Sequence, residues 1–151
     1  EILTVWFPLW DATVENGCLV VWPRSHQEGL FDHCPSDIGL KIPGKFVHGK
    51  AISAEMKRGS AIFMTKLTVH ASHSNNSENI RWSFDLRYNP IGQPTGRSAF
   101  PGFVARSQQN PESESHDPQK WHQLWADARH TLATEGTGKF NRWTSENPVC
   151  A

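Results

Sequence analysis

The chain has 151 residues, which is enough for one domain with a substantial hydrophobic core. Its 15 basic residues balance its 15 acidic residues, so no excess charge indicates a nucleic-acid or acidic-membrane partner. Seven Trp and eight Phe residues argue against disorder, and no apolar run reaches the roughly 18 residues of a transmembrane helix.

The cysteines are few and scattered, and they form no Cys-x-x-Cys pair: Cys18, Cys34 and Cys150. An odd set of this kind fits a reducing interior better than a secreted disulfide scaffold. The chain opens at Glu1 on a strand-like run, with no signal-peptide pattern before it. We therefore expect a cytoplasmic protein, and we expect this sequence to be the C-terminal part of something longer.

The first predicted strands flank a strong turn signal. Residues 2–9 are rich in β-branched and aromatic side chains and predict a strand. Asn16-Gly17 follows, and this pair favours a tight hairpin because both turn positions accept positive φ. The sequence thus predicts a hairpin whose returning strand is 18–22.

Pro and Gly interrupt residues 31–49, which predicts a long loop over the mouth of a pocket. Short strands are predicted at 51–56 and 61–65. Residues 67–70 then add a few extended positions that end at His70.

Residues 80–88 form the clearest predicted strand, because apolar and polar side chains alternate along it. One face carries Ile80, Trp82, Phe84, Leu86 and Tyr88, and the other carries Arg81, Ser83, Asp85 and Arg87. We expect the apolar face to pack against other elements. In a closed or sandwiched β fold the polar face would point inward, where a buried arginine needs an anion.

The last third of the chain differs in character. Residues 89–118 are rich in proline and predict a loop, whereas 119–134 carry apolar residues at helical spacing. The tail is expected to pack across the domain through Phe140 and Trp143. The sequence predicts a mainly β fold with one late amphipathic helix, in a single domain over 1–151 whose core is 1–88 and whose loop and helical tail are 89–151.

A candidate anion site lies at the start of the alternating strand. Arg81 and Ser83 are two residues apart, so their side chains would project side by side. The guanidinium can hold a carboxylate with two hydrogen bonds, and the hydroxyl can add a third. The alternative is a solvated edge strand, which Arg81 alone would favour.

A histidine strengthens the case for a site. His70 ends a short strand, and a polar turn leads back into the Arg81 strand, so both side chains would share one sheet and one cavity. A neutral imidazole is a good ligand for a divalent transition metal, and a keto acid chelating that metal would extend its far carboxylate toward Arg81. His73 is a rival ligand that we rank lower because it lies in the turn. The alternative for both histidines is a polar loop of hydrogen-bonding turn formers.

These residues carry a family resemblance. The stretch "HASHSNNSENIRWS" resembles the distal-histidine and co-substrate-arginine segment of the phytanoyl-CoA dioxygenase family. The family's order of histidine, serine, asparagine and arginine selects His70, Ser72, Asn75 and Arg81. Ser83 fits the arginine-x-serine pair that many such enzymes place on the C5 carboxylate of 2-oxoglutarate.

The N-terminal stretch is similar to the family as well. "WFPLWDATVENGCLVVWPRSH" matches a pattern of Asp-Ala, Asn-Gly and a Pro-Gly-Ser-His turn, with Arg24 in place of the usual glycine. By position, Trp6 corresponds to a residue that packs near 2-oxoglutarate. The resemblance covers about 1–88.

The resemblance implies an iron(II)- and 2-oxoglutarate-dependent dioxygenase with a double-stranded β-helix fold of the jelly-roll or cupin-like kind. Such an enzyme uses O2 to hydroxylate a C–H bond of a small molecule and converts 2-oxoglutarate to succinate. It implies that His70 is a catalytic iron ligand and that the co-substrate contacts Arg81, Ser83, Ser72 and Trp6.

One element of the family pattern is missing. Members supply two further iron ligands from a His-x-Asp motif just upstream of the Trp6 strand. No histidine in this sequence begins such a motif. His26-Gln27-Glu28 has a similar shape but lies in a turn, so a loop-anchoring role is the better interpretation. We expect the true motif before Glu1, which leaves this chain with one of three ligands of a facial triad.

Two other functions stay open. The chain could be a non-catalytic fragment or degenerate homologue that binds a ligand, or a cupin-like metal protein that does not use 2-oxoglutarate. The expected partner is a small-molecule substrate, with no nucleic acid and no membrane. The sequence determines neither the substrate nor the oligomeric state.

Overall fold

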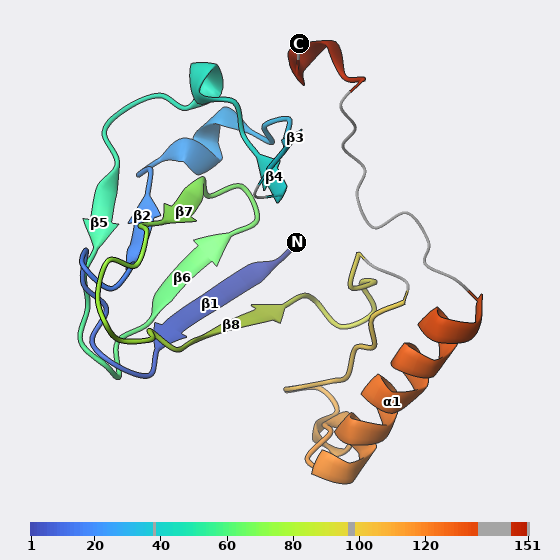
Figure 1. Ribbon diagram of the computed structural model, residues 1–151. Helices are drawn as coiled ribbons and strands as arrows, with labels where there is room; N and C mark the ends of the chain where they lie inside the picture. Colours follow the sequence, from blue (N-terminus) through green and yellow to red (C-terminus); the bar gives the residue numbers. More distant parts are fainter. Residues whose placement is uncertain (38, 97–98, 136–145, 151) are drawn as a thin grey trace. The chain divides into compact units, whose positions relative to one another are not determined.

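The computed structural model describes residues 1–37, 39–96, 99–135 and 146–150 (Figure 1). The chain forms two compact units, of which the first is Glu1–Tyr88 with Trp143–Ala151 and the second is Asn89–Arg142. The described strands lie in the first unit and the α-helix lies in the second. The predicted mainly β character with one late helix is therefore confirmed.

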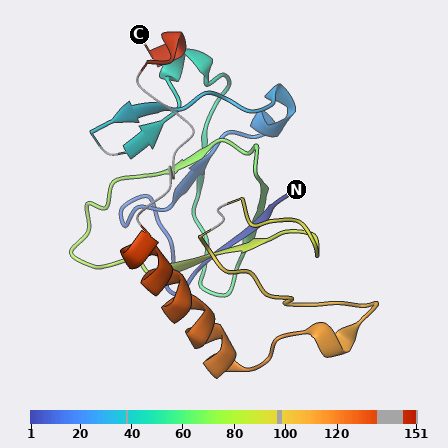
Figure 2. The same ribbon diagram turned by 90° about the vertical axis from the view of Figure 1, so that its right-hand side faces the viewer.

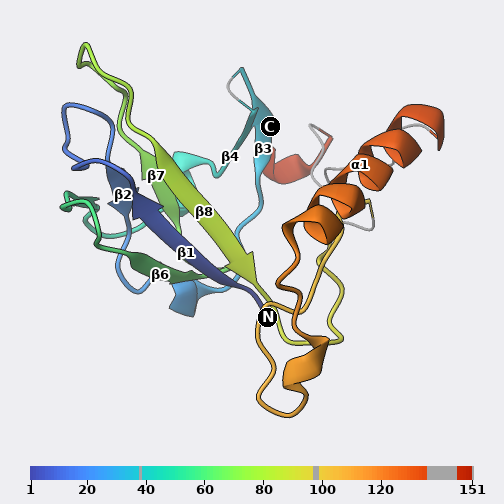
Figure 3. The same ribbon diagram turned by 90° about the horizontal axis from the view of Figure 1, so that it is seen from below.

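Two antiparallel three-stranded sheets build the first unit. One has the order β6-β1-β8, with β1 (Leu3–Pro8) between β6 (Ile62–Thr65) and β8 (Ser83–Tyr88). Figure 3 shows β1 and β8 running side by side. The other has the order β5-β2-β7 and consists of β5 (Ile52–Ala54), β2 (Leu19–Val21) and β7 (His70–Ser72).

Shorter elements complete the chain. A small two-stranded sheet pairs β3 (Cys34–Ser36) with β4 (Gly39–Lys41), and the α-helix is α1 (Pro118–Glu135). The 3-10 helices are η1 (Ser25–Glu28), η2 (Gly44–Phe46), η3 (Pro111–Ser113) and η4 (Pro148–Cys150). No helix within the described residues has the length and hydropathy needed to span a membrane.

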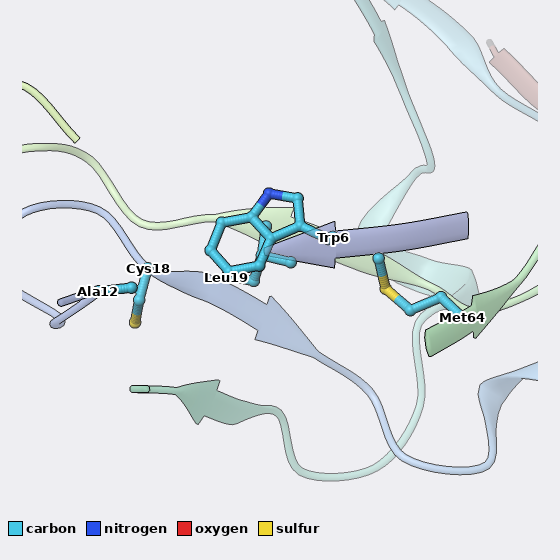
Figure 4. Close-up of a cluster of buried hydrophobic side chains, with 5 residues drawn as sticks. All are labelled: Trp6, Ala12, Cys18, Leu19 and Met64. Carbon is cyan, nitrogen blue, oxygen red and sulfur yellow. The ribbon is translucent and has the colours of Figure 1, made fainter. Parts of the chain in front are cut away.

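The hydrophobic core lies between the two larger sheets. Its buried members are Trp6, Ala12, Cys18, Leu19 and Met64 (Figure 4). Trp6 and Met64 come from β1 and β6 of the first sheet, and Leu19 comes from β2 of the second. A cluster drawn from both sheets fixes which face of each sheet is the inner one.

The alternating strand turns its polar face inward, and the expectation that its apolar face is covered is wrong. Along β1 the inward side chains are Thr4, Trp6 and Pro8, all buried, and in the register of β1 and β8 Trp6 lies opposite Asp85 and Pro8 opposite Ser83. Residues directly opposite each other in an antiparallel pair project from the same face. The apolar residues of 80–88 are correspondingly exposed, with Trp82 at 61%. Alternation tells which residues share a face but not which face is covered.

The predicted hairpin between 2–9 and 18–22 is also wrong, because β1 and β2 belong to different sheets. The turn itself forms, with Gly17 at φ 84°. The Asn16 side chain accepts a hydrogen bond from the Thr13 amide at 2.8 Å and donates one to the Asp11 carbonyl at 2.8 Å. These local bonds close a crossover loop that carries the chain from one sheet to the other.

Cys34 and Cys150 form a disulfide, which the scattered positions of the cysteines did not indicate. It joins the first residue of β3 to η4, and Figure 2 shows the teal β3–β4 hairpin beside the red C-terminal η4. Residues 31–49 therefore contain paired strands rather than only the predicted loop. Sequence spacing cannot reveal a pair of cysteines 116 residues apart. The tail residues Phe140 and Trp143 lie outside the described residues.

The second unit is organised by α1, close to the predicted helix 119–134. The Trp125 ring centroid lies 5.7 Å from that of Phe100 and 6.4 Å from that of Trp121. The Glu114 carboxylate accepts a hydrogen bond from the Ser107 amide at 2.9 Å, which lowers the pKa of that carboxyl. Aromatic contacts and one buried carboxylate thus order this part of the chain.

We expect Gly17→Ala to destabilise the first unit strongly. A Cβ at this position would lie 2.9 Å from the His73 carbonyl oxygen, in addition to the cost of about 1–2 kcal/mol for a left-handed residue with a side chain. Gly59→Ala is the matched control, because Gly59 has φ +87° but open space around its Cβ position. Urea denaturation should show a clearly larger loss of unfolding free energy for Gly17→Ala than for Gly59→Ala. Equal losses would contradict the close approach of the His73 carbonyl to Gly17.

Asp11 gives the stability a defined acid dependence. Hydrogen bonds from the Lys57 ammonium at 2.7 Å and the Arg58 amide at 3.0 Å lower the pKa of its carboxyl. A lowered folded-state pKa contributes stability above the unfolded-state pKa and loses it as the pH falls through the folded value. The difference in unfolding free energy between wild type and Asp11→Asn should therefore be constant near neutrality and shrink below about pH 4. A difference that grows on acidification would refute this assignment.

Candidate functional site

Arg81 is half-buried, and one of its nitrogens lacks a partner. Its Nη1 donates a hydrogen bond to Ser83 Oγ at 2.8 Å, and its Cζ lies 5.3 Å from the centroid of the buried Trp6 ring. Its Nε is buried without a hydrogen-bond partner. A buried donor left unsatisfied costs about 1–3 kcal/mol, and a guanidinium is best satisfied by a carboxylate. The arrangement fits an anionic ligand beside Ser83.

The neighbouring thiol does not supply that anion. Burial raises the pKa of Cys18, the Glu55 carboxylate raises it further, and the Arg81 guanidinium opposes both. The side chain is completely buried in the core, where a thiol packs as a small hydrophobe. A neutral thiol does not compensate the positive charge of Arg81.

A hydrogen-bonded loop delivers Arg81 to this place. The Asn75 side chain accepts a bond from the Ser77 amide at 2.9 Å and donates one to the Asn79 carbonyl at 2.7 Å. The loop is tied to the Asn16-Gly17 turn, since the His73 amide donates to the Cys18 carbonyl at 3.0 Å. Asn75, which the family resemblance selects, thus shapes the loop.

His70 lies on the other sheet from Arg81. It begins β7 rather than ending a strand, and it pairs with Val21 of β2, so the prediction of one shared sheet is wrong. Ser72 pairs with the buried Leu19, and residues opposite each other share a face. His70 and Ser72 therefore face inward from the second sheet, whereas Ser83 and the guanidinium of Arg81 lie on the inner face of the first. The predicted residues are brought to one interior from opposite sides.

The His70 imidazole is exposed and oriented by its own backbone. Its Nδ1 lies 2.8 Å from the Thr68 carbonyl oxygen. A carbonyl accepts but does not donate, so this contact places the proton on Nδ1 and leaves the Nε2 lone pair available to a metal.

His73 is separated from this arrangement. Its Nε2 lies 2.9 Å from Ser53 Oγ, and Ser53 pairs with Val20, whose side chain is on the opposite face from Leu19 and Val21. Its contact is therefore on the outer face of the second sheet, away from His70.

A complete metal site is not formed by the described part of the chain. Within 1–37, 39–96, 99–135 and 146–150, no group of three His, Cys, Asp or Glu side chains could hold a metal ion. His26 and Glu28 lie exposed in η1 and do not supply the missing ligands. Among the described residues His70 offers one imidazole nitrogen to iron, whereas Arg81 and Ser83 suit a carboxylate.

Sequence reasoning missed Ser25. This side chain is buried, and its hydroxyl accepts a hydrogen bond from the Val69 amide at 2.9 Å. It follows Arg24, which has φ 67°. Among the described residues, Arg24 is the non-glycine residue with a left-handed backbone conformation. The signal was present in the "PRSH" stretch, although a motif match does not say which backbone group a serine will hold.

Comparison with known proteins identifies a family for the chain. The family model of phytanoyl-CoA dioxygenase (PhyH) matches residues 1–83. The chain belongs to the phytanoyl-CoA dioxygenase family. The matched region contains both sheets of the first unit up to the start of β8, and with them every residue of the candidate site.

Three curated relatives are about a third identical to this chain over the aligned residues. The phytanoyl-CoA dioxygenase domain-containing protein 1 homolog of Dictyostelium discoideum is 31% identical, with 56% of this chain and 33% of the relative covered. The phytanoyl-CoA dioxygenase of Arabidopsis thaliana is 35% identical, covering 54% and 30%. The domain-containing protein 1 of Mus musculus is 30% identical, covering 57% and 32%. This chain spans about a third of the length of each.

A solved structure resembles the fold. It is EvdO2 from Micromonospora carbonacea var. aurantiaca complexed with 2-oxoglutarate, with a TM-score of 0.53 and 25% sequence identity. The match covers 62% of this chain and 41% of that chain. Membership of the family and this likeness support an oxygenase of the 2-oxoglutarate type in general.

The departure at Arg24 has a measurable cost. A left-handed residue with a side chain is less stable by about 1–2 kcal/mol, and glycine removes this penalty while adding about 0.5–1 kcal/mol of unfolded-state entropy. Arg24→Gly should therefore raise the unfolding free energy by up to about 1.5 kcal/mol. Lys50→Gly is the control, because Lys50 is also an exposed cation but does not have a left-handed backbone conformation. This substitution should lower the unfolding free energy. Equal losses in the two variants would refute strain at Arg24.

Proposed function

We propose that this chain carries the co-substrate site and one metal ligand of an iron(II)- and 2-oxoglutarate-dependent dioxygenase that hydroxylates a C–H bond of a small molecule. The observation that carries the proposal is the buried, unpartnered Nε of Arg81 beside Ser83. Family membership supports the reaction class. The proposed fold is the double-stranded β-helix, which two facing sheets with a shared core support.

The far carboxylate of 2-oxoglutarate suits Arg81 and Ser83. The free Nε–H and a second guanidinium N–H can both donate to it. Ser83 accepts a bond from Nη1, so its own hydroxyl proton remains available for the carboxylate. Trp6 lies beneath the guanidinium and limits its rotation, which prepares the fork before the ligand arrives. In this proposal Trp6 supports the arginine, and Ser72 faces the same interior from the second sheet.

His70 would hold iron through Nε2 while Nδ1 keeps its bond to Thr68. Bound iron would supply the activation of O2 that side chains cannot provide. Its remaining ligands do not gather with His70 in the part of the chain described. The inward position of His70 opposite the arginine site is the feature of this chain that favours a shared metal and keto-acid site.

Binding of 2-oxoglutarate to the chain tests the proposal without requiring turnover. Titration followed by the NMR signal of the Arg81 Nε–H should show a saturable shift as that proton gains an acceptor. Arg81→Lys keeps the charge but loses the fork, and calorimetric titration of this variant should show binding weakened at least about tenfold.

Arg87→Lys is the matched control. Arg87 projects from the same face of β8 as Ser83, but its guanidinium is exposed and already paired with Asp85 at 3.2 Å. It should bind 2-oxoglutarate like the wild type. Equal weakening in both variants would indicate nonspecific attraction to positive charge and would overturn the assignment of Arg81.

The titration and an assay for succinate together separate the two alternative functions. A ligand-binding homologue without catalysis would bind the carboxylate at Arg81 and produce no succinate when iron(II) and O2 are supplied to the full-length protein. A cupin-like metal protein would bind metal through His70, and Arg81→Lys would change nothing.

A further inference from the structure

A short turn holds the backbone of Val69, the residue immediately before His70. The Trp22 amide donates to the Val69 carbonyl at 3.1 Å, and the Val69 amide donates to Ser25 Oγ at 2.9 Å. Both backbone polar groups of Val69 are therefore bonded to the turn that follows β2. Val69 and Ser25 are themselves buried, so water cannot replace either partner.

The turn directs Ser25 inward by means of an unfavourable backbone conformation. Arg24 has φ 67° and ψ 0°, and the next residues close the turn through bonds from the Ser25 amide to the Trp22 carbonyl and from Gln27 to Arg24. Ser25 is 4% exposed, whereas His26 and Gln27 are on the surface. Such a conformation persists where surrounding contacts hold it in place, and the bond from Val69 is one such contact.

We propose that Ser25 is a positioning residue for His70. The inference rests on the proposed role of His70 as a metal ligand. The Ser25 hydroxyl fixes the peptide between Thr68 and Val69, whose carbonyl, Thr68 O, in turn orients the His70 ring at Nδ1. One buried hydroxyl thus fixes the imidazole tautomer and the direction of Nε2 through two consecutive hydrogen bonds. Ser25 itself touches neither co-substrate nor metal in this arrangement.

NMR of the isotope-labelled chain tests the proposal without metal. In the wild type, the imidazole nitrogen shifts of His70 should report one tautomer with the proton on Nδ1. In Ser25→Ala, the freed peptide should allow both tautomers, and the Val69 amide should exchange with solvent at least about tenfold faster. An unchanged His70 tautomer in a folded Ser25→Ala protein would overturn the proposal.

Ser107→Ala is the matched control. Ser107 is also a buried serine, and its hydroxyl also accepts a backbone bond, from the Asn110 amide at 3.0 Å, but it lies in the second unit. Its loss should leave the His70 signals and Val69 exchange at wild-type values. A change of the His70 tautomer in both variants would mean that general loosening, and not positioning, explains the result.

Two measurements keep the test decisive. If Ser25→Ala does not fold, Val69 amide exchange in the wild type decides: protection of about a hundredfold over an unfolded chain is expected, and unprotected exchange refutes the bond. Binding of 2-oxoglutarate at Arg81 should be unchanged in folded Ser25→Ala. Failure of the wild type to bind 2-oxoglutarate would refute the proposed function. The His70 tautomer would still test the role of Ser25 in that case.

Discussion

The contact between the Arg81 guanidinium and the buried Trp6 ring is the constraint on which the site depends. A positive charge held against the core is costly unless an anion joins it, and the surrounding thiol of Cys18 stays neutral. Trp6 is at the same time the side chain through which β1 enters the shared core. Stability of the sheet and orientation of the arginine therefore depend on the same residue.

The two sheets divide the work of the site between them. The first sheet presents Arg81 and Ser83, which can bind a carboxylate. The second sheet presents the His70 imidazole, whose Nδ1 is bonded to the Thr68 carbonyl. Neither sheet has the complete chemistry, so the distance between the two halves is set by the core side chains that separate the sheets. Small changes in Leu19 or Met64 would therefore affect both halves, although neither residue has polar chemistry.

The sequence was a good guide to local pattern and a poor one to pairing. Alternation in 80–88 correctly placed Arg81 with Ser83, because side-chain direction in a strand has a fixed period. It could not tell which face is inside, since that depends on the strand's neighbours. The Asn16-Gly17 signal gave the turn but not its topology, because local bonds of Asn16 close the turn whatever sheet the flanking strands join. The partner of Ser25 could not be read from the sequence, because it is a backbone amide far along the chain.

The disulfide between Cys34 and Cys150 encloses His70, Ser72, Arg81, Ser83 and the whole second unit in one covalent ring, while Trp6 and Ser25 lie outside it. A protease that cuts once inside this ring opens a circle and releases no fragment. The imidazole and the guanidinium would remain on one linked molecule even if the peptide bond between them were broken. Only reduction of the sulfur–sulfur bond would then separate the pieces, so the mass of a nicked protein would depend on the thiol content of its surroundings.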